Sequence, residues 1–284
     1  MGGIWLSKAD KIYLDIAKEI LENGFEHSVE GAYYADGRPV KVKKLRRRVV
    51  MEFDLQDEFP ILTSKFVPYK TAFKELYWIW FLQSNDVRDL HNLGVHIWDE
   101  WMGEDYTIGK AYGYQLKKYK LVDRLINTIK NNPYDRGMVV SLWNEEDLPY
   151  MNIRPCAFQT IWDVTDNKLN CSLIQRSGDW GLGVCFNFTQ YAILVHIIAK
   201  VTGLEVGTLT HFINNAHIYD AHYDAIKKQL DNPQFDAPKL SIPSLDNFYD
   251  YTPDDIQLID YKHAGKIDME IAIVQNPLKK MGEK

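Results

Sequence analysis

The chain has 284 residues, of which 46% are apolar and 25% charged, and its net charge at neutral pH is −6. This composition is that of a globular protein with a substantial core, and the negative balance argues against a body that coats nucleic acid. Three cysteines at scattered spacing form neither a disulfide framework nor a metal motif, and no run approaches the roughly 18 apolar residues of a membrane span, so we expect a cytoplasmic protein with no metal and no membrane partner.

The N-terminal segment begins with a helical pattern. Apolar side chains recur at helical spacing over residues 8–23, and Asn23-Gly24 is a natural stop, so we expect an amphipathic helix there. A turn signal at Asp36-Gly37 precedes residues that favour β-strands. Six of the eight residues from 41 to 48 are basic. A solvated strand face is the more common explanation of such a run, and a polyanion site is the alternative.

A second helix is predicted over residues 69–83, which are apolar on most faces and therefore buried. Glu75 lies within it. A carboxylate in a buried helix is costly unless it is paired or used, so Glu75 is either a partnered core charge or a functional group. The aromatic loop that follows contains Trp98 and Trp101, for which core packing is the usual role.

The remaining segments alternate between strand and helix patterns. A large apolar helix over 189–202, ending near Gly203, is the strongest of them. The other predicted elements are a helix at 121–131, a strand at 138–144, two strands within 157–175 joined at Asp166-Asn167, a strand leading to His217 and Tyr219, a helix at 221–230, and short strands in the tail.

Residues 154–191 concentrate the groups that carry chemistry. Cys156 follows a proline, and a nucleophilic thiolate needs a nearby cation such as Arg176. The amide of Asn187 can both donate and accept, which suits the edge of a uracil-like ring. Ser177 and Asp179 add hydrogen-bonding groups on the same short segment. This pattern favours covalent catalysis by Cys156.

At these residues the sequence resembles the thymidylate synthase family. PCAFQ, QRSGD and FNFTQY match its central segments, and FPILTSK, KELYWIW, HIWDEW, AYGYQ and NAHIYDAH match others in family order, over about residues 9–273. The resemblance implies a single α+β domain over 1–284, with a large mixed β-sheet covered by helices and a short extension at 274–284. It also implies a homodimer formed through the sheet face, with no stable nucleic-acid partner.

The resemblance implies a role for each site residue. The co-substrate would be 5,10-methylene-tetrahydrofolate, and Arg136 would be contributed to the partner's site. The catalytic residues would be Cys156, Glu75, Tyr112, Asn187 and Asp179. The nucleotide would be bound by Arg136, Arg176, Ser177, Asn187, His217 and Tyr219, and the folate by Lys65, Trp98, Trp101 and Asp179.

Departures from the family pattern concern the phosphate site and the C-terminus. Gly137 stands where the family has a second adjacent arginine, and Glu30 aligns with a phosphate-binding arginine, where it would repel the phosphate. Arg38 or the basic cluster at 43–48 are candidate substitutes. About eleven residues follow 270–273, where many members end, so closure of the site must differ.

The function expected from the resemblance is reductive methylation of dUMP to dTMP through a Cys156 adduct. The alternative within the family is a hydroxymethylase acting on dUMP, CMP or dCMP, which the altered phosphate site, the small residues Gly137 and Gly178 and the extended C-terminus favour. A second alternative is an inactive relative that binds RNA through residues 41–48. Asn187 supports a uracil base, and the intact set of Cys156, Glu75 and Asp179 argues against an inactive protein.

Overall fold

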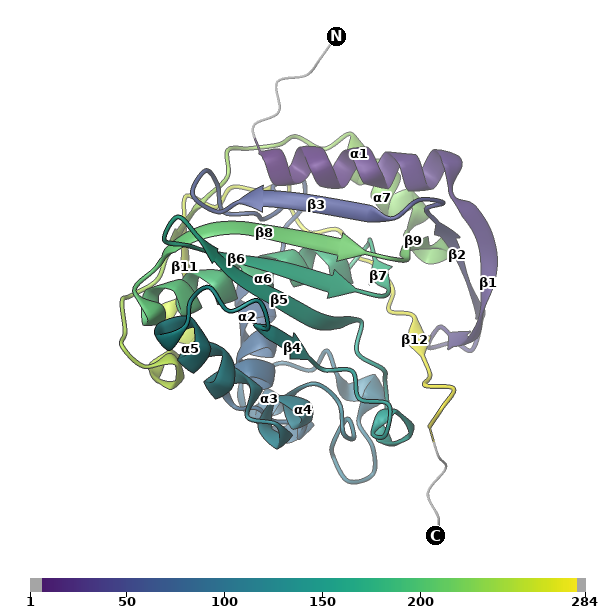
Figure 1. The fold of residues 1–284 in the computed structure, drawn as a ribbon. Coiled ribbons are helices and arrows are strands. Elements are labelled where there is room, and N and C mark those ends of the chain that lie inside the picture. The colour runs from purple at the N-terminus through teal and green to yellow at the C-terminus, as the bar shows by residue number, and fades with distance from the viewer. Residues whose placement is uncertain (1–6, 280–284) are drawn as a thin grey trace.

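The computed structural model describes residues 7–279 and shows an α+β fold (Figure 1). The α-helices in this range are α1 (Lys8–Asn23), α2 (Tyr69–Leu76), α3 (Val87–Asn92), α4 (Gly113–Lys118), α5 (Leu121–Asn131), α6 (Gly183–Thr202) and α7 (Tyr223–Leu230). The strands are β1 (Phe25–Tyr33), β2 (Pro39–Lys44), β3 (Val49–Asp54), β4 (Val139–Ser141), β5 (Ala157–Thr165), β6 (Lys168–Gln175), β7 (Gly178–Asp179), β8 (Glu205–Ile213), β9 (Ala216–Tyr219), β10 (Lys239–Ser241), β11 (Gln257–Ile259) and β12 (Ile273–Val274).

Two five-stranded sheets form the frame of the molecule. One has the order β3-β8-β6-β5-β4 and the other the order β12-β1-β2-β9-β7. The pairs β6–β8 and β7–β9 are parallel, and all other pairs of adjacent strands in these two sheets are antiparallel. The short connections 176–177 and 214–215 lead from β6 into β7 and from β8 into β9, so the sheets meet there. The predicted mixed sheet is confirmed, but it is divided in two.

Helix α6 forms the centre of the core. Its mean hydropathy and its length would allow it to cross a membrane, and it is the one such helix in the described range, but most of it is buried inside the protein. It ends at Gly203, whose φ of +71° is the left-handed conformation that glycine adopts without strain. The helix begins at Gly183, six residues before the predicted start, so Asn187 lies inside the helix.

Helix α2 ends sooner than predicted. The chain passes from α2 into a wider π-helical turn over Tyr77–Phe81, in which the Leu82 N–H donates to the Tyr77 carbonyl at 3.0 Å. Gln83 then takes a φ of +48°, and the helix does not continue to it. π-Helical turns are frequent at functional sites. Here the turn follows Glu75 by two residues.

Several other predicted boundaries hold closely. Helices α1 and α5 have the predicted limits, and β5 and β6 are joined at Asp166-Asn167 as expected. The predicted strand at 138–144 is limited to β4, and the predicted helix at 221–230 is a 3₁₀ turn (Asp220–His222) followed by α7.

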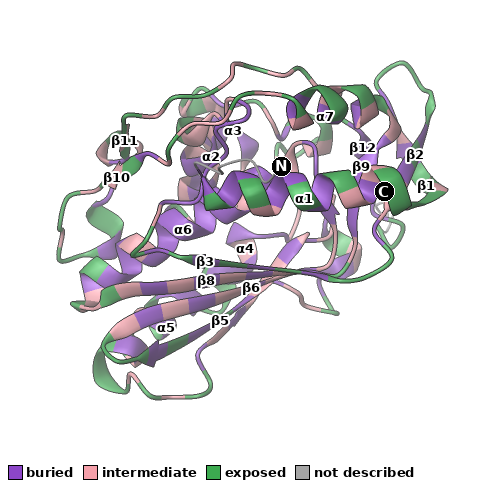
Figure 2. Cartoon of the chain, turned by 90° about the horizontal axis from the view of Figure 1, so that it is seen from above, coloured by how far each residue is buried: buried purple, intermediate pink, exposed green. Residues whose placement is uncertain are grey.

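One face of the sheet β3-β8-β6-β5-β4 is left open in the single chain; this is the larger of the two sheets, because its strands contain more residues. Figure 2 shows α6 and α2 together on one side of this sheet. The other side carries Val50 and Glu52 of β3 and Ile161 and Asp163 of β5, all exposed. Val50, on the edge strand β3, is 60% exposed, and Ile161 is 37% exposed.

The C-terminal residues 273–279 lie across three parts of the molecule. β12 pairs with β1 at Ala32 and Tyr33. Hydrogen bonds then fasten this segment to β1, to the aromatic loop and to the loop before Cys156: Gln275 N–H to the Gly31 carbonyl (3.0 Å), Trp101 Nε1 to the Val274 carbonyl (3.1 Å), and the Asn276 amide to the carbonyls of Leu148 (2.9 Å) and Met151 (2.8 Å).

Candidate active site

Cys156 and Arg176 face each other at the ends of β5 and β6. These strands are antiparallel, so the residue before β5 meets the residue after β6, and the Arg176 N–H donates to the Cys156 carbonyl at 2.9 Å. The guanidinium donates to the carbonyls of Pro155 (2.9 Å) and Arg154 (2.7 Å). It lies 3.7 Å from Sγ of Cys156. A fixed cation at this distance stabilises a thiolate.

Tyr112 supports the backbone of the nucleophile. Its hydroxyl accepts the Cys156 N–H at 3.0 Å, and its ring meets Trp98 edge-on with centroids 5.3 Å apart. Its φ of +48° is rare for a tyrosine and is held by the surrounding packing. Burial raises the pKa of Tyr112 well above its usual range, so its hydroxyl stays protonated.

The Glu75 carboxylate is held between two donors. One oxygen accepts Trp98 Nε1 at 2.6 Å, and the other accepts the Gln190 amide of α6. Burial raises the pKa of Glu75, while these two hydrogen bonds oppose the rise. A carboxyl group with a raised pKa keeps its proton to higher pH than a free carboxyl group does, which suits a general acid or base.

Asn187 is oriented by a buried polar chain. Gln175 donates from Nε2 to Oδ1 of Asn187 at 3.0 Å, and His211 Nε2 lies 2.7 Å from Gln175 Oε1. Burial lowers the pKa of His211 to about 3, so the imidazole is neutral and donates to Gln175. The Asn187 amide nitrogen therefore points away from Gln175, where its nearest recorded acceptor, Gln190 Oε1, is 3.5 Å away.

Asp179 is paired with a histidine from a distant part of the chain. Its Oδ1 accepts the Gly181 N–H at 2.9 Å and lies 3.5 Å from His222 Nδ1. Burial alone would raise the pKa of Asp179, but His222 outweighs it and the pKa is lowered. Gly181 is required here, because a Cβ at this position would lie 2.3 Å from His222 Nδ1. Asp179 therefore stays ionised.

Three residues predicted to bind the nucleotide or the folate lie near Asp179. β7 and β9 place Asp179 beside His217, and the His217 and Tyr219 rings meet edge-on at 5.0 Å. Lys65 is buried, and its ammonium donates to the Gly181 carbonyl. The residues that a continuous set of contacts connects to Cys156 or Asp179 are Glu75, Tyr112, Trp98, Trp101, Arg176, Ser177, Asn187, His217, Tyr219 and Lys65.

Arg136 is not part of this group. It is exposed, and it precedes β4, which pairs with β5 through Val139 and Ile161. Continuing that register places residue 136 beside residue 164, roughly 25 Å along β5 from Cys156. Arg136 cannot reach the Cys156 of its own chain.

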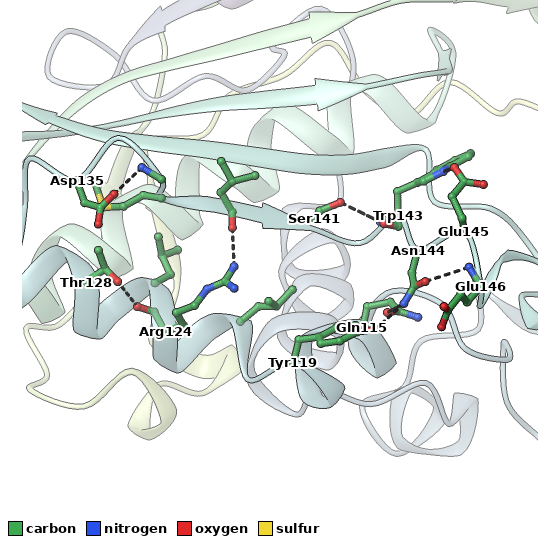
Figure 3. A pocket seen from close by; sticks show the side chains of 15 residues that line it. Gln115, Tyr119, Arg124, Thr128, Asp135, Ser141, Trp143, Asn144, Glu145 and Glu146 are labelled. Carbon is green, nitrogen blue, oxygen red and sulfur yellow. Dashed lines mark hydrogen bonds between the residues drawn. The ribbon is translucent and has the colours of Figure 1, made fainter.

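A pocket of about 840 Å³ lies beside the Arg136 loop and not at Cys156 (Figure 3). α5 and β4 form its walls, and Arg124 crosses it to donate to the Val139 carbonyl at 2.8 Å. Asp135 and Gly137 of the loop line one end, and Trp143 and Asn144 line the other.

Two of the candidate substitutes for the lost phosphate ligands, Arg38 and Arg47, form ion pairs elsewhere. Arg38 pairs with Asp36 and Glu270, at 2.5 and 2.8 Å. In the basic run, Arg47 pairs with Glu19. Glu30 is exposed in an irregular part of β1.

Arg154 is a residue that the sequence did not single out. It is half-buried two residues before Cys156, and no hydrogen bond or ion pair of its side chain is recorded in the described range. Burial and the neighbouring Arg176 lower its pKa, and the proximity of Cys156 opposes this. Two guanidinium groups therefore lie near the nucleophile. The sequence feature that could have identified Arg154 is its position immediately before the Pro155-Cys156 pair.

Comparisons with known proteins agree with this geometry. The family model described as thymidylate synthase matches residues 11–273. A thymidylate synthase of Clostridium beijerinckii is 53% identical over 275 residues, covering 94% of this chain and all of the relative. Thymidylate synthase 1 of Bacillus subtilis is 43% identical over 281 residues, with the same coverage. The solved structure of thermostable thymidylate synthase A from Bacillus subtilis superposes with a TM-score of 0.89 at 43% identity, covering 93% of this chain and 99% of that one. The chain is therefore a member of the thymidylate synthase family.

Proposed function

We propose that the chain is a methyltransferase that converts dUMP to dTMP, with 5,10-methylene-tetrahydrofolate as co-substrate. The observation that carries the proposal is the position of Arg176, whose guanidinium is fixed 3.7 Å from the Cys156 sulfur. The thymidylate synthases to which the chain is similar support the same reaction.

The chemistry assigns a task to each residue. Carbon 5 of uracil is a weak nucleophile, and addition of the Cys156 thiolate to carbon 6 moves electron density onto carbon 5 and the ring oxygen. Asn187, oriented by Gln175, hydrogen-bonds the edge of the ring and so selects uracil. Glu75, with its raised pKa, takes up through ordered water the proton that carbon 5 loses, and expulsion of the Cys156 thiolate from carbon 6 restores the ring of the product. When bound, the folate supplies the carbon and the hydride.

The folate site is assigned to the aromatic loop and to Asp179. Trp98 and Trp101 meet edge-on with centroids 5.7 Å apart, and their apolar faces suit a planar ring. Asp179 is kept ionised by His222, so it accepts hydrogen bonds from ring N–H groups. His217 and Tyr219 are assigned to the nucleotide, and Lys65 to the turn that holds Asp179.

The phosphate is assigned to arginines from two chains. Arg176 and Ser177 lie at the end of β6, and Arg136 cannot reach its own site, so we assign Arg136 to the partner's site in a homodimer. The open face of the larger sheet, with exposed Val50 and Ile161, supports such a dimer. Arg154 is assigned as the cation that offsets the loss at Gly137, because its guanidinium is near Arg176 and forms no ion pair with a carboxylate of residues 7–279.

The two alternatives have less support. The relatives are named as thymidylate synthases, which does not favour the hydroxymethylase. Two of the six basic residues of the run at 41–48 are engaged within the chain, because Lys43 donates to the Leu21 carbonyl and Arg47 pairs with Glu19. The three cysteines are free in the structure, which fits the reducing cytoplasm that we propose as its location.

Product analysis by mass spectrometry tests the reaction. The chain is incubated with methylene-tetrahydrofolate and, in separate reactions, dUMP, UMP, dCMP and CMP. We expect dUMP alone to gain a methyl group, with dihydrofolate formed in equal amount. A hydroxymethyl product without folate oxidation would overturn the proposal in favour of the hydroxymethylase. Absence of any product from the folded chain would favour the inactive relative.

A further inference from the structure

Two histidines and one aspartate form a cluster on the surface of the aromatic loop. His91 Nε2 lies 2.6 Å from one oxygen of Asp99, and His96 Nδ1 lies 3.4 Å from the other. The two imidazole rings are 4.4 Å apart between centroids, with an angle of 31° between their planes. One ligand atom from each of the three residues lies within 4.8 Å of the other two. The reaction proposed above uses none of these residues.

The backbone that carries the cluster is well fixed. His91 lies in the last turn of α3, and the chain then reverses at Gly94, whose N–H donates to the His91 carbonyl at 2.8 Å. Leu90 and Val95 anchor the two sides of this turn in the core. Asp99 begins the 3₁₀ turn Asp99–Trp101, and its N–H donates to the His96 carbonyl at 3.4 Å. The three side chains are therefore brought together by the fold itself.

Among the described residues, the Asp99 side chain is engaged only inside this cluster. Within residues 7–279, its only recorded side-chain contacts are the two imidazoles, and it does not cap the 3₁₀ turn that it begins. The three side chains are accessible, with exposed fractions of 28% for His91, 63% for His96 and 43% for Asp99. An ion and its water molecules can therefore enter from solvent.

We propose that His91, His96 and Asp99 bind a divalent transition metal ion, with Zn²⁺ as the representative. Imidazole nitrogen with one carboxylate is a donor set for zinc and its neighbours, whereas Mg²⁺ and Ca²⁺ require oxygen ligands. In a tetrahedral zinc site the ligand atoms lie roughly 3.4 Å apart, as follows from metal–ligand distances of about 2.0–2.2 Å. The ligand atoms, which lie within 4.8 Å of one another, would reach this spacing by rotation of the three side chains. A water molecule completes the fourth position.

Zinc at this site would also restrain the aromatic loop. Asp99 directly follows Trp98, whose indole donates to Glu75, and the 3₁₀ turn ends at Trp101. An ion that joins Asp99 to α3 through His91 fixes the start of this turn. The site is thus adjacent to the catalytic groups without including any of them.

Equilibrium dialysis against Zn²⁺ tests the proposal. The full chain is used with Cys156→Ser, so that the nucleophilic thiol does not bind the ion, and zinc is measured by atomic absorption. We expect one zinc per chain, and an affinity at least tenfold weaker after either His91→Gln or His96→Gln. His263→Gln, which changes another exposed histidine, is the matched control and should leave the affinity unchanged.

Cobalt gives an independent measurement of the ligands. Co²⁺ bound to the same chain should show the visible ligand-field bands of a four-coordinate nitrogen and oxygen site, and both histidine variants should lose them. Stoichiometric zinc that persists in both variants, or no zinc retained by the parent chain, would overturn the proposal. Circular dichroism of each variant confirms that the fold is retained.

Discussion

At the scale of single residues, the proton-transfer properties of Glu75 depend on two donors that come from distant segments. Trp98 is 23 residues away in the chain and Gln190 is 115 residues away, yet each donates to one carboxylate oxygen. Burial favours the neutral acid and the donors favour the anion, so the balance of the two sets the pKa of Glu75.

Trp98→Phe shifts this balance in a known direction. Loss of the 2.6 Å hydrogen bond destabilises the carboxylate, so the pKa of Glu75 rises further above its ordinary value. The limb of the kcat–pH profile that reports Glu75 should move to higher pH. Trp101→Phe is the matched control, because its indole donates to Val274 and not to Glu75. Equal shifts in both variants would show that the aromatic loop acts only through packing.

Asn187→Asp tests how the base is recognised. A carboxylate accepts from the amino group of cytosine but cannot donate to the carbonyl oxygen of uracil. The ratio of kcat/KM for dCMP over dUMP should therefore increase by at least tenfold, measured by product formation with each nucleotide. Gln175 can still donate to an aspartate at this position, so the orientation is kept. An unchanged ratio would mean that another group recognises the base.

At the scale of elements, a buried carboxylate joins α4 to the chain that follows β4. The side chain of Asp147 is 4% exposed and accepts from Lys110 (3.1 Å), Lys118 (2.7 Å) and Gln115 (3.0 Å). Burial alone would raise the pKa of Asp147, but these donors outweigh it and lower the pKa to about 2. The folded state therefore favours the charged form of Asp147 more than the unfolded chain does.

The pH dependence of stability follows from this pKa. The folded-state value lies below the unfolded one, so the contribution is present above about pH 4 and is lost as the pH falls toward 2. Asp147→Asn should lower the free energy of unfolding by about 1–2 kcal/mol at pH 7, less than the full shift because solvent screens the partly exposed lysines. Urea titrations at pH 7 and pH 3 measure the difference. Asp224→Asn, in an exposed pair with Lys227, should have no comparable effect.

The sequence predicts long periodic elements better than it predicts their ends. α1 and α5 have clear apolar stripes and clear stop signals, and both boundaries are correct. The predicted start of α6 was wrong. Gly183 and Asn187 are weak helix formers, but tertiary contacts such as that between Gln175 and Asn187 stabilise the first turn of the helix. The predicted strand leading to His217 and Tyr219 missed the break at 214–215 between β8 and β9, although two adjacent asparagines, which strands disfavour, mark it.

The candidate site was predictable where the chemistry is local. Cys156, Arg176 and Asp179 lie on one short stretch whose residue types are those of covalent catalysis. Gln175, Gln190, His211 and His222 act only through partners that are distant in sequence, and an isolated glutamine or histidine on a strand or helix carries no local signature. Arg154 was missed because its importance depends on its proximity to Arg176.

At the scale of the whole molecule, the proposed site requires two chains, and subunit complementation tests this directly. Cys156→Ala and Arg136→Ala should each be nearly inactive alone. After the two variants are unfolded and refolded together, a mixed dimer holds one site with both residues intact. When subunits pair at random, about half of the dimers are mixed, and each mixed dimer has one intact site of two. About a quarter of the wild-type activity should therefore return. The assay is dTMP formation before and after mixing.

The control for this experiment mixes two variants in which each substitution affects the site of the chain that carries it. A mixture of Cys156→Ala with Asn187→Ala leaves every site with one lesion, so no activity should return. Recovery of activity in this control, or none in the test mixture, would contradict the assignment of Arg136 to the partner's site.

The C-terminal segment has a consequence for the thermodynamics of substrate binding. Ordering one residue's backbone costs about 1–2 kcal/mol in conformational entropy at 25 °C. Residues 273–276 are already ordered against β1, Trp101 and the loop before Cys156, so this cost is met when the chain folds. A relative whose terminus orders only around its ligands meets the same cost on binding. Calorimetry of nucleotide and folate binding should accordingly show a smaller entropy loss and a smaller heat-capacity change for this chain.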